Sequence, residues 1–144
     1  MNKRFTSAAS LAIYSMFLIN LLVFKNMPVI RIGHMLFNFG GTNADGEANF
    51  VPFKTILSYL LGSHGWLIAG LNLIGNIVLL IPIGLLATLV YQDMTWKKAL
   101  IIAVAAGLLL EGMQVIFNVG IFDVDDVILN AFGVMIGYWI YKKI

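Results

Sequence analysis

Residues 111–137, EGMQVIFNVGIFDVDDVILNAFGVMIG, combine a hydrophobic background with acidic side chains, and this combination decides the fold. The stretch holds four of the seven acidic residues of the chain, namely Glu111, Asp123, Asp125 and Asp126. A carboxylate at membrane depth is costly, so it is paired, faces a water-filled cavity or takes part in chemistry. What these carboxylates face is therefore the central question about the chain.

The composition is that of an integral membrane protein. A length of 144 residues favours one domain over residues 1–144. Hydrophobic residues make up 60% and charged residues only 11%, with a mean hydropathy of +0.93. The net charge of +2 comes without a basic cluster, which argues against a nucleic-acid surface. The absence of cysteine excludes disulfides, thiolate metal sites and cysteine nucleophiles.

Four apolar stretches are long enough to cross a bilayer, because about 20 helical residues span a hydrocarbon core of about 30 Å. They cover about residues 5–24, 66–91, 97–117 and 124–141. No small-residue cleavage site follows the first stretch, so it is interpreted as an uncleaved span rather than a signal peptide. The predicted fold class is an all-α integral membrane protein with a bundle of four transmembrane helices.

The connection between the first two spans, residues 25–65, is predicted to contain a short amphipathic helix. Residues 40–47 are rich in glycine and polar side chains, which is typical of a turn or loop. Residues 53–62 carry apolar side chains at helical spacing, with Lys54 between them. A helix of this kind lies in the membrane interface. The alternative is an exposed connector with one hydrophobic face.

The distribution of lysine and arginine predicts the orientation of the spans. Four spans place both termini and the loop at residues 92–98 on one side of the membrane. That side has six basic residues and the other side has three, which favours cytoplasmic termini. Residues 25–65 and the break at 118–123 then lie outside.

Polar residues of three spans fall at a similar depth below the outer surface. With a rise of about 1.5 Å per residue, Asn72 lies about 9 Å and Asn76 about 15 Å from the outer end of the second span. By the same rise, Glu111 and Asn130 each lie about 9 Å down the third and fourth spans, and Asp126 is near the surface. The sequence therefore predicts one outward-facing polar site. Its predicted lining is Glu111, Asp123, Asp126 and Asn130, with Gln114, Asn72 and Asn76 ordering it and Lys54 meeting an anionic head group.

The polar side chains of the fourth span continue into a stripe of small residues. Asp123, Asp126, Asn130, Gly133 and Gly137 follow at spacings of three or four, so they share one helix face. Glycines on such a face permit close approach of a neighbouring helix. Two structural interpretations stay open beside the binding site: asparagines hold helices together through hydrogen bonds, and aspartates cap helix starts.

Four short motifs follow one another between residues 49 and 141. They are Asn49-x-x-Pro52-Phe53, then Asn72-x-x-Gly75-Asn76 with Pro82-x-Gly84, then Glu111-x-x-Gln114, then Asp123-x-Asp125-Asp126-x-x-x-Asn130-x-x-Gly133-x-x-x-Gly137. In this order they resemble the VanZ-like family of small bacterial membrane proteins. The resemblance implies a multi-pass protein of the bacterial cytoplasmic membrane, associated with resistance to the glycopeptide teicoplanin. It brings no settled catalytic activity and no cofactor.

The chain departs from the resemblance at residues 118–122, where many members carry an arginine shortly before the Asp-x-Asp-Asp segment. Lys54, Arg31 or a metal ion would then have to balance the acids, or the acids stay solvated. The leading hypothesis is a non-enzymatic protein that engages a lipid-linked precursor or a lipophilic glycopeptide. The rivals are a metal-assisted enzyme acting on a membrane lipid or envelope precursor, and a structural subunit whose polar residues only join helices.

Overall fold

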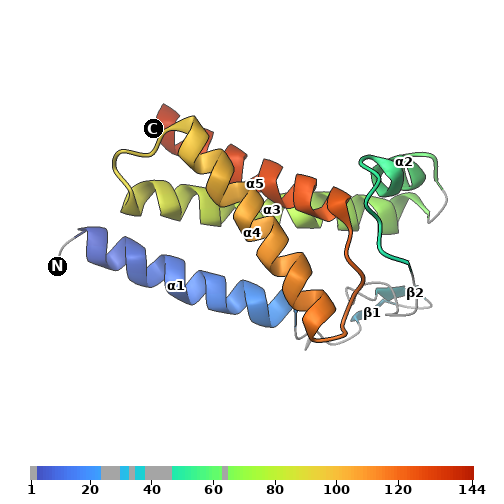
Figure 1. Ribbon diagram of the computed structural model, residues 1–144. Coiled ribbons are helices and arrows are strands. Elements are labelled where there is room, and N and C mark those ends of the chain that lie inside the picture. The colour runs from blue at the N-terminus through green and yellow to red at the C-terminus, as the bar shows by residue number, and fades with distance from the viewer. Residues whose placement is uncertain (1–2, 24–29, 33–34, 38–46, 63–64) are drawn as a thin grey trace.

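A computed structural model describes residues 3–23, 30–32, 35–37, 47–62 and 65–144 of the chain (Figure 1). Most of the predicted glycine-rich loop at residues 40–47 lies outside these described residues. The side chain of Arg31, one of the candidate cations for the acids, also lies outside the description.

Four long helices dominate the structure and are long and apolar enough to cross a membrane. They are α1 (Lys3–Leu22), α3 (Trp66–Val90), α4 (Trp96–Ile116) and α5 (Val124–Lys143). The predicted all-α bundle of four membrane-spanning helices is confirmed (Figure 1). Helix α1 begins and ends two residues before the predicted span of 5–24.

A short helix, α2 (Lys54–Leu60), follows a tight turn and lies beside the start of α3 (Figure 1). The helix begins after Phe53, which has a left-handed backbone conformation with φ of 67°. Its outward side carries exposed Leu57 and Leu60, whereas Thr55 and Tyr59 are partly buried. The amphipathic helix predicted between residues 53 and 62 is therefore present, but it is shorter.

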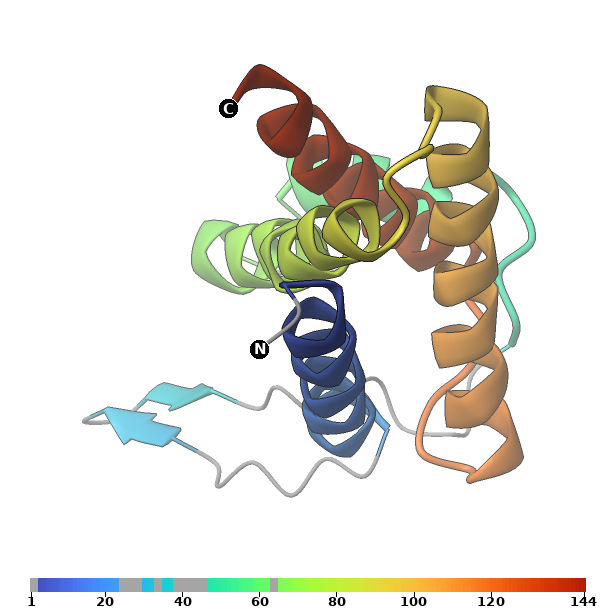
Figure 2. The same ribbon diagram turned by 90° about the vertical axis from the view of Figure 1, so that its left-hand side faces the viewer.

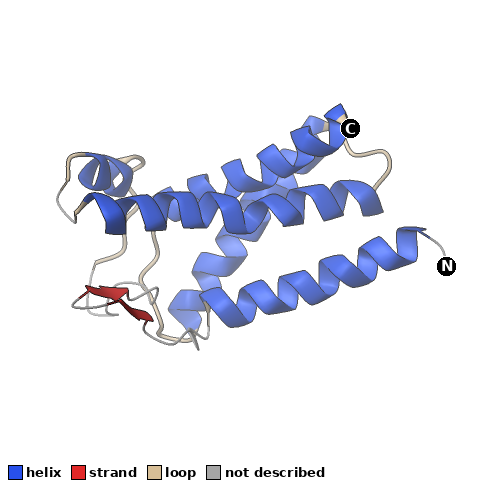
Figure 3. Ribbon diagram, turned by 180° about the vertical axis from the view of Figure 1, so that it is seen from behind, coloured by secondary structure: helices blue, strands red, loops and turns tan. Residues whose placement is uncertain are grey.

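A small hairpin that was not expected from the sequence precedes this helix. Strands β1 (Ile30–Ile32) and β2 (Met35–Phe37) pair antiparallel, with Ile30 opposite Phe37 (Figure 3). In Figure 1 the hairpin lies at the same end of the bundle as α2. It leaves the helical fold class unchanged.

Glycines bring α3 and α5 into direct backbone contact. A Cβ atom on Gly133 would overlap the carbonyl oxygen of Ile77, and one on Gly137 would overlap that of Ile81. Only residues without a side chain permit such an approach, so the glycine stripe of α5 is a packing surface, as predicted. This contact fixes the two helices that carry Asn76 and Asp126.

The other two long helices flank the α3–α5 pair on separate sides (Figure 2). Helix α4 packs on α5 and α1 packs on α3, where the Tyr14 hydroxyl donates to the carbonyl of Leu79 at 2.9 Å. Half of the most apolar 18-residue window of α5 is buried, compared with 6% for α1. Helix α5 is thus the central element of the bundle, and its first turn carries the acids.

Candidate functional site at the acidic end of the bundle

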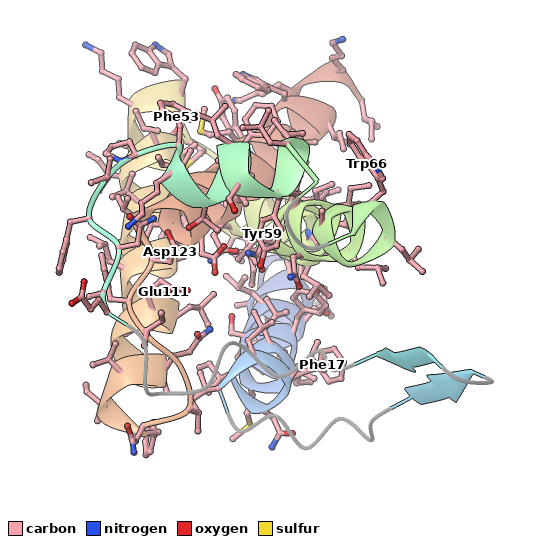
Figure 4. All side chains as sticks on the ribbon, turned by 90° about the vertical axis from the view of Figure 1, so that its right-hand side faces the viewer. Phe17, Phe53, Tyr59, Trp66, Glu111 and Asp123 are labelled. Carbon is pink, nitrogen blue, oxygen red and sulfur yellow. The ribbon has the colours of Figure 1, made fainter. Side chains whose placement is uncertain are left out.

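The candidate site lies where α4 ends, α5 begins and α2 covers the bundle (Figure 4). Residues 49–56 run alongside the start of α5 and are joined to it through the backbone. Asn49 N donates to the carbonyl of Phe122 at 2.8 Å, and Val124 N donates to the carbonyl of Asn49 at 3.0 Å. These bonds form an isolated parallel bridge between Asn49 and Asp123, so the first motif of the chain lies directly against the last.

Asp125 holds the start of α2 in place. Its side chain is fully buried, and its Oδ1 accepts a hydrogen bond from Phe53 N at 2.5 Å. Its Oδ2 accepts from Thr55 N at 2.7 Å and from Ile56 N at 3.1 Å. The first N–H groups of a helix have no partner within the helix, and a carboxylate there also favours the helix dipole. Asp125 therefore belongs to α5 in sequence but caps α2.

Asp123 connects three segments of the chain. It is the N-cap of α5, where its Oδ1 accepts from Asp125 N at 2.8 Å. The same oxygen accepts from Asn49 Nδ2 at 2.9 Å, and Oδ2 accepts from the Thr55 hydroxyl at 2.6 Å. Asp123 N in turn donates to Glu111 Oε2 at 3.1 Å, which links α4 to α5. Glu111 is only 1% exposed, so its carboxylate is enclosed in this network.

Asp126 points away from this network toward α3. Its Oδ1 accepts from Asn76 Nδ2 at 2.7 Å. One turn further along α5, Asn130 is 3% exposed, and its Oδ1 has no hydrogen-bond partner among the described residues. The two acceptors lie four residues apart and therefore on one face of α5.

Tyr59 closes the polar group from the side of α2. Its hydroxyl accepts a hydrogen bond from Asn72 Nδ2 at 3.0 Å, which joins α2 to α3. Figure 4 shows Tyr59, Asp123 and Glu111 on the same side of α2, with Phe53 on the opposite side. Burial raises the pKa of Tyr59 above its usual value, and the nearby carboxylates of Asp126 and Asp123 raise it further.

A model of the VanZ/LLP1 family matches residues 11–144. The chain belongs to the VanZ/LLP1 family. The resemblance predicted from the four motifs is thereby confirmed, and membership makes the chain a multi-pass membrane protein of a family linked to glycopeptide resistance in general. Teicoplanin resistance is the association behind the family's name. Comparisons with curated proteins and with solved structures give no match.

Two residues of the predicted site lie apart from the acids of this VanZ/LLP1 protein. Lys54 is exposed and, among the described residues, makes no hydrogen bond or ion pair with a carboxylate. Gln114 packs against the turn after α4: its carbonyl accepts from Val119 N at 2.9 Å, and its Oε1 would lie 2.8 Å from a Cβ on Gly120. The remaining predicted residues meet in two groups. Glu111 joins Asp123 in the first, and Asp126, Asn76, Asn130 and Asn72 line the α3–α5 side in the second.

Three residues that organise the network were not predicted as site residues: Thr55, Tyr59 and Asn49. Asn49 stands in the first quoted motif, so its presence there was the available signal. Asp125 stands in the last motif but was also left out of the predicted lining. Its donors are backbone N–H groups about 70 residues away, with separations of 72, 70 and 69, and side-chain chemistry alone does not reveal such donors.

The oxygens of Asp123 and Asp125 are already used by the protein. All four carboxylate oxygens accept hydrogen bonds from residues 49–56 or from the start of α5. Backbone N–H groups, the Asn49 amide and the Thr55 hydroxyl thus satisfy the oxygens for which a balancing cation or solvent was considered. Within the described residues, no group of three or more His, Asp or Glu side chains is arranged to hold a metal ion. No cation site is assigned to the acids.

Proposed function

We propose that this VanZ/LLP1 protein engages a cell-envelope ligand at an outward-facing polar site, and that this contributes to resistance to teicoplanin-type glycopeptides. The ligand is a lipid-linked precursor or a lipophilic glycopeptide, and the whole chain acts as one domain. Asp126 and Asn130 on α5 form the centre of the lining, while Asn72 and Asn76 on α3 order it. Glu111, Gln114 and Asp123 support it from the end of α4 and the start of α5.

The orientation in this proposal follows from the basic residues. Six lysines and arginines fall on the side of the termini, compared with three on the side of the acids. Such a bias favours the termini in the cytoplasm of a bacterial cell. The acids then face the outer leaflet, where lipid-linked precursors and glycopeptides meet.

The observation that carries the proposal is unused acceptor capacity on one face of α5. The buried Asn130 Oδ1 has no donor among the described residues, and a buried polar atom without a partner costs free energy. Within the same part of the chain, Asp126 accepts only from Asn76, through one of its two oxygens. A ligand that supplies hydroxyl or amide donors satisfies both acceptors. Saccharide and peptide groups of envelope precursors and glycopeptides are rich in such donors.

Lys54 supports a lipid-linked or lipophilic ligand rather than a soluble one. It lies at the start of α2, whose outward side carries the exposed apolar residues Phe53, Leu57 and Leu60. An exposed cation beside an apolar helix face is typical of an interfacial helix. The ammonium group of Lys54 would then meet an anionic head group while the helix contacts its acyl chains.

The proposal is tested by the glycopeptide susceptibility of cells that express single variants at equal abundance. Asp126→Asn and Asn130→Leu are expected to lower teicoplanin resistance toward that of cells without the protein. Glu111→Gln is expected to lower it as well, since it weakens the acceptor that holds the start of α5. Asp93→Asn, the same chemical change in an exposed loop at the other end, serves as the matched control and should leave resistance intact. Unchanged resistance in both the Asp126 and Asn130 variants would remove the site.

A further inference from the structure

A second polar feature lies at the opposite end of the bundle from the acids, where α1 begins and α3 turns into α4 (Figure 1). A cavity of about 370 Å³ opens there between the first turn of α1 and the loop after α3. Its wall includes Arg4, Tyr91, Asp93, Lys98, Ile101 and Ile102. None of these residues belongs to the candidate site described above.

Two cationic side chains of the cavity wall donate hydrogen bonds to backbone carbonyls at the end of α3 and in the loop after it. Arg4 Nε donates to the carbonyl of Val90 at 3.4 Å, and Lys98 Nζ donates to the carbonyl of Asp93 at 3.4 Å. Only one of the three N–H donors of the Lys98 ammonium is used in this way. The carboxylate of Asp93 is the one acidic group in the wall, so two positive charges stand against one negative charge.

Apolar side chains continue the cavity wall along α4 toward the middle of the membrane. Ile101 and Ile102 follow Lys98 by three and four residues, which places them one turn deeper on the same helix face. Ile101 is 69% exposed on the outer surface of α4, where lipid chains pack. A cation at the interface followed by apolar residues one turn deeper matches the order of phosphate and acyl chain in a phospholipid.

The surroundings of the cavity fit the same occupant. Exposed Tyr91 and Trp96 flank the loop, as aromatic residues do at membrane interfaces. This end of the bundle carries six basic residues, at positions 3, 4, 97, 98, 142 and 143, and one acidic residue, Asp93. Each lysine or arginine near an anionic membrane surface contributes about 1 kcal/mol to lipid attraction, about fivefold in affinity.

We propose that this cavity binds an anionic glycerophospholipid, with its phosphate between Arg4 and Lys98 and its acyl chains along Ile101 and Ile102. The site is independent of the ligand proposed at the acidic end. It takes a lipid from the leaflet at the end that holds both termini, and it ties α1 to the α3–α4 turn.

The test uses the full-length protein in detergent, with phosphatidylglycerol as the probe and native mass spectrometry to measure its dissociation constant. Phosphatidylcholine and inorganic phosphate are the comparison ligands. Wild-type protein is expected to bind phosphatidylglycerol at least tenfold more tightly than either. Arg4→Gln and Lys98→Gln should each weaken this binding about fivefold, and the double variant about twenty-five-fold if the two charges act independently.

Lys97→Gln is the matched control, because it removes the same charge one residue away while its ammonium lies 5.7 Å from the centre of the Trp96 ring rather than in the cavity wall. It should weaken binding less than twofold. Arg4→Lys and Lys98→Arg keep the charge and should retain the lipid even if a neutral variant folds poorly. Ile102→Trp fills the cavity without changing charge and should also weaken binding.

Three outcomes would overturn the proposal. Equal weakening by Lys97→Gln would mean attraction of lipid to the charged end in general. Tight binding of inorganic phosphate, or its displacement of the lipid at equal concentration, would mean a free-anion site. Undiminished binding by Ile102→Trp would place the lipid elsewhere on the bundle. Failure of the acidic-end variants to alter resistance has no bearing on these measurements, so the two proposals fail separately.

Discussion

At one end of the bundle Asp125 is fully buried and accepts three backbone N–H groups, whereas at the other end Asp93, Lys97 and Lys98 are exposed around a loop. A buried charge is tolerated only where the protein supplies donors or an opposite charge, so it becomes part of the framework. An exposed charge needs no such partner and stays available for ligands. Within the described residues, the acidic end therefore combines a rigid frame with the unsatisfied acceptor of Asn130, and the basic end presents the exposed side chains of Lys97 and Lys98.

The largest expected effect comes from Asp125→Asn. The variant keeps one acceptor oxygen and replaces the other with an N–H donor, which opposes the N–H groups of the α2 start. We expect the free energy of unfolding to fall by about 3–5 kcal/mol, since breaking a buried charged network leaves several donors unsatisfied. Unfolding in detergent, induced by increasing sodium dodecyl sulfate and followed by helical circular dichroism, measures the change.

Asp93→Asn is the control for this comparison, because it makes the same chemical change at an exposed loop position. Its unfolding midpoint should match that of the wild type. Similar losses of stability in both variants would contradict the contrast between the buried, hydrogen-bonded carboxylate of Asp125 and the exposed carboxylate of Asp93. A normal midpoint for Asp125→Asn would show that α2 is held by something other than this carboxylate.

Two threonines near helix starts test the same contrast between buried and exposed polar groups, with a smaller expected loss of unfolding free energy. The Thr55 hydroxyl donates to Asp123 Oδ2 at 2.6 Å and accepts from Asn49 Nδ2 at 3.0 Å, whereas the exposed Thr95 hydroxyl accepts from Lys98 N at 3.4 Å. Thr55→Val should cost about 2–3 kcal/mol, because Asp123 Oδ2 loses its hydroxyl donor and the Asn49 amide loses one of its two hydrogen bonds. Thr95→Val removes an N-cap and should cost about 0.5–1 kcal/mol.

These two variants are compared in the same unfolding experiment. The larger loss should come from Thr55→Val. The reverse order would mean that the network around Asp123 adds little to stability.

The bundle could be predicted from sequence because its signals are local in the chain. The four apolar helices and the glycine stripe ending at Gly137 follow from local composition and periodicity, and the structure confirms both. The partners of the acids could not be predicted in the same way. Asp125 is satisfied by backbone donors at residues 53–56, and every residue has such a donor except proline, so side-chain identity carries no signal for it.

The predicted site also shows what could and could not be derived from the depth of a residue along its helix. Depth along the helices assigned Asn76 and Asp126 to one site but put Asn76 about 15 Å down and Asp126 near the surface. Their side chains nevertheless meet at 2.7 Å. Depth could not foresee that Gln114 turns toward the loop at Gly120, because that depends on how the chain leaves α4. Depth also did not distinguish Asp123 and Asp125, which hold residues 49–56, from Asp126 and Asn130, whose acceptor oxygens are not fully used within the described part of the chain.

Asn130 distinguishes a ligand site from simple helix contact by a small change in stability. Its carbonyl oxygen is buried without a partner, so Asn130→Leu should leave the free energy of unfolding unchanged or raise it by about 1 kcal/mol. Asn76→Leu removes the donor to Asp126 and should lower it by about 1–2 kcal/mol. If Asn130→Leu instead destabilises the protein as much as Asn76→Leu, the role of Asn130 is to join helices and its side chain is not an acceptor for a ligand.

The smallest expected effect is a shift in the titration of Tyr59, which reports on the polar group beneath α2. Burial raises the pKa of Tyr59, while donation from Asn72 to its hydroxyl oxygen partly offsets this rise by stabilising the phenolate. The stabilisation linked to this shift is fully present below the usual tyrosine pKa of about 10. It is lost as the pH rises through the higher folded-state value, because deprotonation then opposes folding.

Ultraviolet absorbance of the phenolate, taken as the difference from Tyr59→Phe, isolates this titration. Asn72→Leu removes the donor and should raise the pKa of Tyr59 further, whereas Asp126→Asn removes a nearby negative charge and should lower it. Asp93→Asn, at the other end of the bundle, should leave the titration in place. A pKa of Tyr59 that does not respond to Asn72 or Asp126 would mean that α2 does not rest on the α3–α5 surface in the membrane.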